Sequence, residues 1–109
     1  MRRVALILAA LAVLGAAVAM PSLGASTKTV LLKDNFFTPK KLTISKGTKV
    51  HWVWKGKTRH NIAVANGPSF FRAGTRKKGH FDHTFKKKGT YSIVCTIHAP
   101  DMHMTIKVK

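Results

Sequence analysis

The sequence predicts an all-β domain, a β-sandwich of seven or eight short strands. Residues 49–55 alternate between two faces, one of which carries Val50, Trp52 and Trp54. This period of two, with aromatic and β-branched residues, is the signal of a strand with one buried face. Turn residues such as those at 66–68 separate the segments of this kind, and no segment has a convincing helical period. Short strands with turns at such spacing are typical of a sandwich.

In the first half of the chain, strands are also expected at residues 29–33, 41–45 and 59–65. The first two contain threonine and branched apolar residues, and Asp34-Asn35 and Pro39 between them are turn material. In the third, His60 falls on the same face as the apolar residues two and four positions further on. A polar group on a core face needs a partner there, and a metal is one such partner.

In the second half, residues 72–79 are expected to form a basic loop and residues 83–85 a short strand. Longer strands are expected at 90–95 and 103–108. Successive side chains on a strand point to opposite faces, so Cys95 shares the core face with the apolar residues two and four positions before it.

Residues 1–25 are predicted to be a cleaved signal peptide. Two arginines precede the apolar stretch 4–20, which ends near a small-x-small pattern, so cleavage is expected after Ala19 or after Ala25. The apolar stretch is at the lower limit of about 17–25 residues needed to span a bilayer, and an uncleaved anchor is the alternative. The sequence therefore predicts one exported domain over residues 26–109, in the periplasm or an equivalent compartment.

The chain is strongly basic, with 20 Lys and Arg residues against three aspartates and a formal net charge of +17. Such charge favours anionic partners while saying little about fold. The charge has three interpretations: docking to an acidic redox protein, a generally solvated cationic surface, or binding to anionic lipid or a surface polymer. Nucleic acid is not expected as a partner, because most aromatic residues alternate inward and the leader exports the chain. The basic clusters are Lys40-Lys41, Lys55/Lys57/Arg59, Arg76-Lys77-Lys78 and Lys86-Lys87-Lys88.

Candidate metal ligands gather after the strand at 90–95. Cys95 is the single cysteine, so it cannot form an internal disulfide, and it is followed by His98 and then by Met102. A lone cysteine is usually a buried small hydrophobe. A thiolate, an imidazole and a thioether so close together are instead the ligand types of a blue-copper site, which needs one further histidine from elsewhere in the chain.

The mature chain resembles the plastocyanin, amicyanin and pseudoazurin group of cupredoxins. This resemblance implies a Greek-key β-sandwich with one copper ion at one end, held by His60, Cys95, His98 and Met102. It also implies that Asn61 ties the His60 strand to the cysteine loop and that His98 is the electron port. The motifs that carry it are Asp34–Pro39, Leu42–Val50, Trp52, His60-Asn61, Thr84-Phe85, Gly89–Tyr91 and the cysteine loop.

The spacing of the last ligand departs from the family pattern. The family usually has two or four residues between the last histidine and the methionine, whereas three separate His98 from Met102 and five separate it from Met104. Met102 is preferred as the axial ligand, because the residues after it match the closing strand with fewer offsets. Met104 is then expected to be an inward core residue.

The sequence therefore predicts a soluble, monomeric, type 1 copper protein that carries single electrons and is not an enzyme. Cys95 lies between Val94 and Thr96, without the His-Cys-His arrangement that couples a blue site to a trinuclear cluster. Copper delivery or sequestration is the alternative function, and a basic surface-binding module is a third.

The other four histidines are expected to be ordinary solvated side chains. His80 and His83 form a His-x2-His pattern, for which a secondary Zn(II) or Cu(II) site is the alternative interpretation. His51 faces away from the tryptophans of its strand, and His103 follows Met102 directly. Trp52 and Trp54 are expected in the core rather than in a redox relay.

Overall fold

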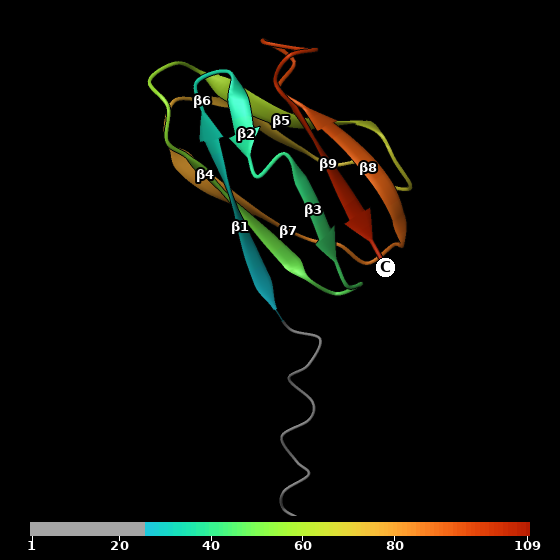
Figure 1. Cartoon of the computed structure of the whole chain (residues 1–109). Coiled ribbons are helices and arrows are strands. Elements are labelled where there is room, and N and C mark those ends of the chain that lie inside the picture. Colours follow the sequence, from blue (N-terminus) through green and yellow to red (C-terminus); the bar gives the residue numbers. More distant parts are fainter. Residues whose placement is uncertain (1–25) are drawn as a thin grey trace, which may run out of the picture.

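A computed structural model describes residues 26–109, which form nine strands in two sheets packed face to face (Figure 1). The predicted signal peptide lies outside the described residues. Within residues 26–109 there is no helix with the length and apolar character required to cross a membrane. The strands are β1 (Thr27–Lys33), β2 (Phe36–Thr38), β3 (Lys41–Ile44), β4 (Lys49–Trp54), β5 (His60–Asn66), β6 (Arg72–Arg76), β7 (Gly79–Thr84), β8 (Gly89–Val94) and β9 (His103–Val108).

The two sheets are both of mixed strand direction. One has four strands in the order β2-β1-β4-β7, and the other has five in the order β3-β9-β8-β5-β6. The pairs β1–β4 and β3–β9 are parallel, while the remaining neighbours are antiparallel. The predicted all-β sandwich is therefore confirmed.

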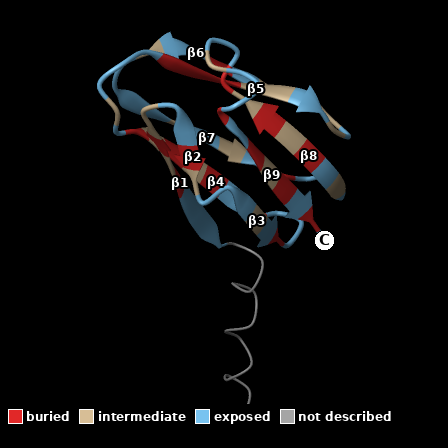
Figure 2. Ribbon diagram, turned by 45° about the horizontal axis from the view of Figure 1, so that its top comes forward, coloured by how far each residue is buried: buried red, intermediate tan, exposed pale blue. Residues whose placement is uncertain are grey.

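The core lies between the sheets and follows the alternation of the strands (Figure 2). Val50, Trp52 and Trp54 are buried, whereas the residues between them are only half-buried. The Trp52 ring lies 5.7 Å from that of Phe71 and 5.9 Å from that of Phe81, between centroids. The tryptophans are core residues, as expected.

One segment expected to be a loop contains a strand, and the short strand expected at 83–85 begins earlier, so these two predictions were wrong. Asp34-Asn35 and Pro39 are turn residues, as expected, but the sequence did not predict β2, which lies between them and forms a hairpin with β1 through Asn35, a residue with a φ of 70°. Residues 72–79 include β6, which pairs with β5, and β7 begins at Gly79 rather than at residue 83. β2, β6 and β7 are sheet edges; β6 and β7 carry exposed polar residues, whereas the exposed residue of β2 is Phe36. Their pairing with a neighbouring strand, and not a local apolar alternation, makes them strands.

Candidate metal centre

The candidate ligands meet at one end of the sandwich, where the loop 95–102 joins β8 to β9 (Figure 1). β5 and β8 are antiparallel neighbours, with Ala63 opposite Val94. Because of this pairing, the start of β5 lies beside the end of β8. His60 opens β5 and Cys95 follows β8, so residues far apart in the sequence become neighbours.

Three donor side chains lie together at this end. The distance between the Nδ1 atoms of His60 and His98 is 3.3 Å, and the distance from Cys95 Sγ to His98 Nδ1 is 3.6 Å. The ligand atoms of all three residues lie within 4.8 Å of one another. His60 and Cys95 are fully buried, and His98 is half-buried. The structure thus presents two imidazoles and one thiol in a single cluster.

Backbone hydrogen bonds close the loop that carries Cys95 and His98. The His98 amide donates to the Cys95 carbonyl at 3.2 Å, and the Met102 amide donates to the His98 carbonyl at 3.2 Å. The Cys95 amide in turn donates to the Met102 carbonyl at 3.1 Å. These bonds fix the backbone that presents the Cys95 and His98 side chains.

Asn61 joins the β5 strand to this loop, as the family resemblance implied. Its side-chain oxygen accepts from the Thr96 amide at 2.8 Å, and its side-chain nitrogen donates to the Thr96 hydroxyl at 2.8 Å. The Asn61 backbone N–H points at Cys95 Sγ, 3.5 Å away. This contact places a backbone N–H donor at the sulfur, and the thiolate is the form of a cysteine that binds metals.

The two methionines occupy different places. Met104 lies in β9 opposite Ile93 of β8 and is fully buried, as expected for a core residue. Met102 precedes β9, is also fully buried, and is bonded through its backbone to both Cys95 and His98. Met102 therefore belongs to the loop of the cluster.

Asp34 orients the His60 ring, a role that neither its place in a turn nor its place in the motif at residues 34–39 predicts. Its Oδ1 lies 3.1 Å from His60 Nε2, on the side of the ring away from His98. The carboxylate also accepts from the backbone amides of Lys57 and Thr58. These backbone bonds first, and then the His60 contact, hold the pKa of Asp34 well below its usual value. A carboxylate on one ring nitrogen leaves the other, Nδ1, free to bind a metal.

Gly56 leaves the space that this carboxylate fills. A Cβ atom at position 56 would lie 2.2 Å from Asp34 Oδ1, so only glycine fits there without displacing the aspartate. In the sequence, the one sign that Asp34 has a special role is the scarcity of acidic residues, of which the chain has three.

His80 and His83 do not share a site. His80 is exposed on the outer face of β7, whereas the His83 ring stacks on Phe71 with 3.9 Å between centroids. The alternative of a metal held by the His-x2-His pattern was therefore wrong. His103 is exposed, with its Nδ1 at 3.1 Å from the Pro100 carbonyl.

Comparison with known families gives the class of this protein. Residues 27–109 match the copper binding proteins of the plastocyanin/azurin family. The chain belongs to this family, and its fold is that of a cupredoxin. Comparison with curated proteins found no match.

Solved structures share the fold. The copper-containing nitrite reductase NirK from Thermus scotoductus SA-01 is 31% identical, with a TM-score of 0.66 over 76% of this chain and 22% of that chain. A purple cupredoxin from Nitrosopumilus maritimus is 21% identical, with a TM-score of 0.66 over 75% of this chain and 99% of that one. The reduced state of an amicyanin mutant is 25% identical, with a TM-score of 0.67 over 84% and 88% of the two chains. The chain thus spans about a fifth of the nitrite reductase and most of the two small proteins.

The residues present fit the copper that the family implies. Imidazole suits copper in either oxidation state, and a thiolate is a soft ligand that favours Cu(I). His60, Cys95 and His98 supply these donors in a cluster that hydrogen bonds from Asp34 and Asn61 brace. The family and the donor chemistry together assign copper as the cofactor.

Proposed function

We propose that this protein is a soluble, monomeric one-electron carrier with a type 1 copper site held by His60, Cys95, His98 and Met102. The observation that carries the proposal is the cluster of one buried thiol and two imidazoles, with donor separations of 3.3 and 3.6 Å. Copper bound there supplies a Cu(I)/Cu(II) couple.

The surrounding residues hold this donor set in one geometry for both oxidation states. Asp34 fixes the His60 ring, and the Asn61 amide supports the Cys95 sulfur. Two imidazoles and a thiolate with a weak axial thioether form a compromise that both Cu(I) and Cu(II) tolerate. Met102 is the methionine proposed to supply that thioether, and its backbone bonds to Cys95 and His98 support this choice. A braced and buried site needs little rearrangement when its charge changes by one electron.

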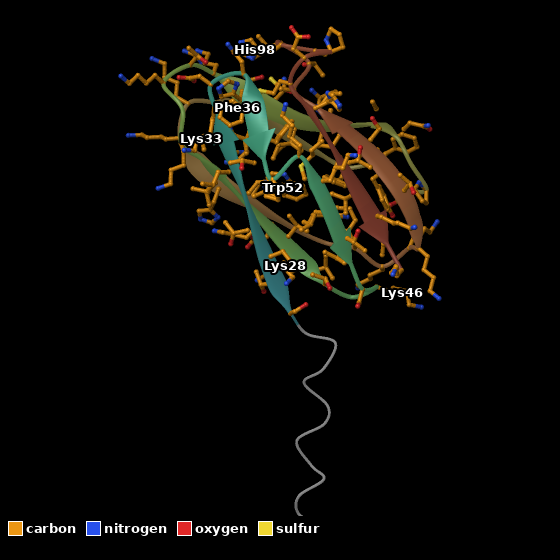
Figure 3. The ribbon with its side chains drawn as sticks, in the orientation of Figure 1. Lys28, Lys33, Phe36, Lys46, Trp52 and His98 are labelled. Carbon is orange, nitrogen blue, oxygen red and sulfur yellow. The ribbon has the colours of Figure 1, made fainter. Side chains whose placement is uncertain are left out.

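His98 is the proposed electron port. It is the least buried member of the cluster, and Figure 3 shows it at the end of the molecule where Phe36 also lies, opposite the end that carries Lys46. Ile97 beside it is 51% exposed and Phe36 is 41% exposed. Exposed apolar side chains near an accessible imidazole provide a dry contact for a redox partner.

The proposed partner is an acidic redox protein. The chain carries a net charge of +17, and Arg59, the residue before the ligand His60, is exposed. Opposite charge on a partner raises the rate of encounter more than the affinity. Residues 1–25, the proposed signal peptide, place the carrier in the periplasm or an equivalent exported space.

Catalysis by this chain alone is not proposed. Cys95 is flanked by Val94 and Thr96, so no neighbouring histidine links the cluster to further metal ions. The related domain in the nitrite reductase is a small part of that longer chain.

The test is the visible spectrum of the copper-loaded protein. An intense blue thiolate-to-copper absorption that bleaches reversibly on reduction is expected, and it should vanish in Cys95→Ser while the β-domain remains folded. Met102→Leu should shift the band and the reduction potential, because it removes the axial sulfur. Met104→Leu is the matched control, and its spectrum should be unchanged. Retention of the blue band in Cys95→Ser would refute the site.

Copper delivery is the second candidate, favoured by the accessibility of His98 to a competing ligand. It predicts slow electron self-exchange and rapid transfer of Cu(I) to an acceptor. Self-exchange that is fast compared with copper release would exclude it.

A further inference from the structure

The outer face of the β4–β7 pair carries a second cluster of ligand-type side chains. His51 in β4 lies directly opposite Asp82 in β7, and Val53 lies opposite His80. His80 and Asp82 are two residues apart on one strand, so they project from the same face as His51. Trp52 and Phe81, between them in the two strands, point into the core.

The three side chains are within reach of a single ion. His51 Nδ1 contacts Asp82 Oδ1, and the rings of His51 and His80 are 5.2 Å apart between centroids. One ligand atom from each residue lies within 4.8 Å of the others. Metal–nitrogen and metal–oxygen bonds of about 2.0–2.2 Å place neighbouring ligands of one tetrahedral ion about 3.3 Å apart. Rotation of these side chains, which project from two rigid, paired strands, can shorten the present separations of the ligand atoms to this value.

The charge distribution makes this cluster unusual for the chain. There are only three acidic residues against 20 basic ones, yet one of them faces two histidines at this place. The cluster is open to solvent, since His80 and Asp82 are exposed and His51 is half-buried. An ion can therefore enter, and a water can complete its coordination.

We propose that His51, His80 and Asp82 form a second metal site, on the outside of the sandwich, for a divalent transition metal of the Zn²⁺ or Cu²⁺ type. Two imidazoles and one carboxylate match the nitrogen and oxygen donors that these ions take, and three protein ligands leave one position open. The site has no thiolate and shares no residue with the His60–Cys95–His98 cluster. Lys49 disfavours the binding of a cation there, because its positively charged Nζ lies 3.9 Å from the other carboxylate oxygen of Asp82.

The test is a titration of the copper-loaded protein with Zn²⁺, followed by calorimetry and by the histidine ring signals in NMR spectra. One Zn²⁺ should bind per chain and shift the ring signals of His51 and His80 while the copper absorption stays constant. His80→Gln should weaken binding by about tenfold or more, since one of three protein ligands is lost. Because Zn²⁺ binding is read directly, the result does not depend on whether the copper centre transfers electrons.

A matched pair of lysine variants tests whether Zn²⁺ affinity depends on the charge next to this site or on the net charge of the whole chain. Lys49→Gln should strengthen Zn²⁺ binding by about threefold, since it removes a positive charge next to the ion. Lys107→Gln removes the same charge from the other sheet and should leave the affinity nearly unchanged.

A second equivalent of Cu²⁺ should give a tetragonal EPR signal distinct from that of the first. Equal Zn²⁺ affinity in His80→Gln and the wild type would overturn the proposal. Zn²⁺ uptake only with loss of the copper absorption would overturn it too.

Discussion

Two clusters in this small domain each combine two histidines with a third donor, and their surroundings give them different chemistry. The His60–Cys95–His98 cluster lies at the end of the sandwich, where His60 and Cys95 are fully buried. The cluster on the outer face of β4 and β7 has a carboxylate in place of the sulfur and is largely exposed. Burial excludes water and fixes the donors, whereas exposure permits exchange of ions and ligands.

Each cluster also uses one of the three acidic residues, in a different way. Asp34 contacts the ring nitrogen of His60 that faces away from the other donors. Asp82 contacts His51 from within the cluster and is itself a candidate ligand. The comparison shows that the same contact, carboxylate to imidazole, positions a ligand in one place and completes a donor set in the other.

Removal of copper should produce the largest effect on stability. A metal that binds only the folded state stabilises it by about 4 kcal/mol when its free concentration is 1,000 times Kd. Chemical denaturation should therefore show a large gain on copper loading, lost in Cys95→Ser. Zn²⁺ at the same free concentration should stabilise the protein less, because the outer cluster is exposed and lacks the thiolate. Equal gains from the two metals would remove the distinction between the clusters.

Gly56→Ala should damage the buried cluster alone. The new Cβ would collide with the Asp34 carboxylate, and such overpacking costs about 1–3 kcal/mol of unfolding free energy. The copper spectrum should change as well, since the aspartate can no longer orient His60. Gly74→Ala is the control, because nothing lies within 4 Å of a Cβ at that position. Similar losses in both variants would argue against the packing explanation.

Asp34→Asn and Asp82→Asn should each weaken metal binding at one cluster and leave the other cluster unaffected. Loss of the carboxylate behind His60 should weaken copper binding by about tenfold, the lower end of the range for residues that support metal ligands. Zn²⁺ binding at the outer cluster should be unaffected. Asp82→Asn should weaken Zn²⁺ binding and leave copper affinity unchanged. Competition with a chelator measures both affinities, and a parallel loss in the two variants would contradict independent sites.

His83, which belongs to neither cluster, should add a small pH dependence. Burial lowers its pKa below the ordinary value of 6.5, so the unfolded chain takes up the proton first. Its contribution to stability is full above pH 6.5 and is lost as the pH falls through the pKa of the folded state. His83→Phe keeps the stacking on Phe71 and should flatten this slope in denaturation curves, whereas His103→Gln should not. An unchanged slope in His83→Phe would assign the dependence to other groups.

Much of the fold could be predicted from local patterns. The alternation in β4 predicted which face of that strand is buried, and parity placed Cys95 and Met104 in the core, where the structure has them. The sequence did not predict β2, and it predicted a loop where β6 lies. β2 has only three residues and β6 has little apolar alternation, so their assignment depends on pairing with a neighbour and not on their own residues.

The candidate site, like the fold, could be predicted from the sequence only in part. Two motifs of the site can be recognised from the sequence, because a loop and a strand end present their residues in chain order. They are the Cys95-x2-His98 spacing and the His60-Asn61 pair. The contact of Asp34 with His60, 26 positions away, and that of Asp82 with His51, 31 positions away, are not. Local patterns were enough to establish the alternation and the set of candidate donors. Which aspartate contacts which histidine depends on the folded chain, because strand register and sheet order bring distant residues together and no local pattern encodes those contacts.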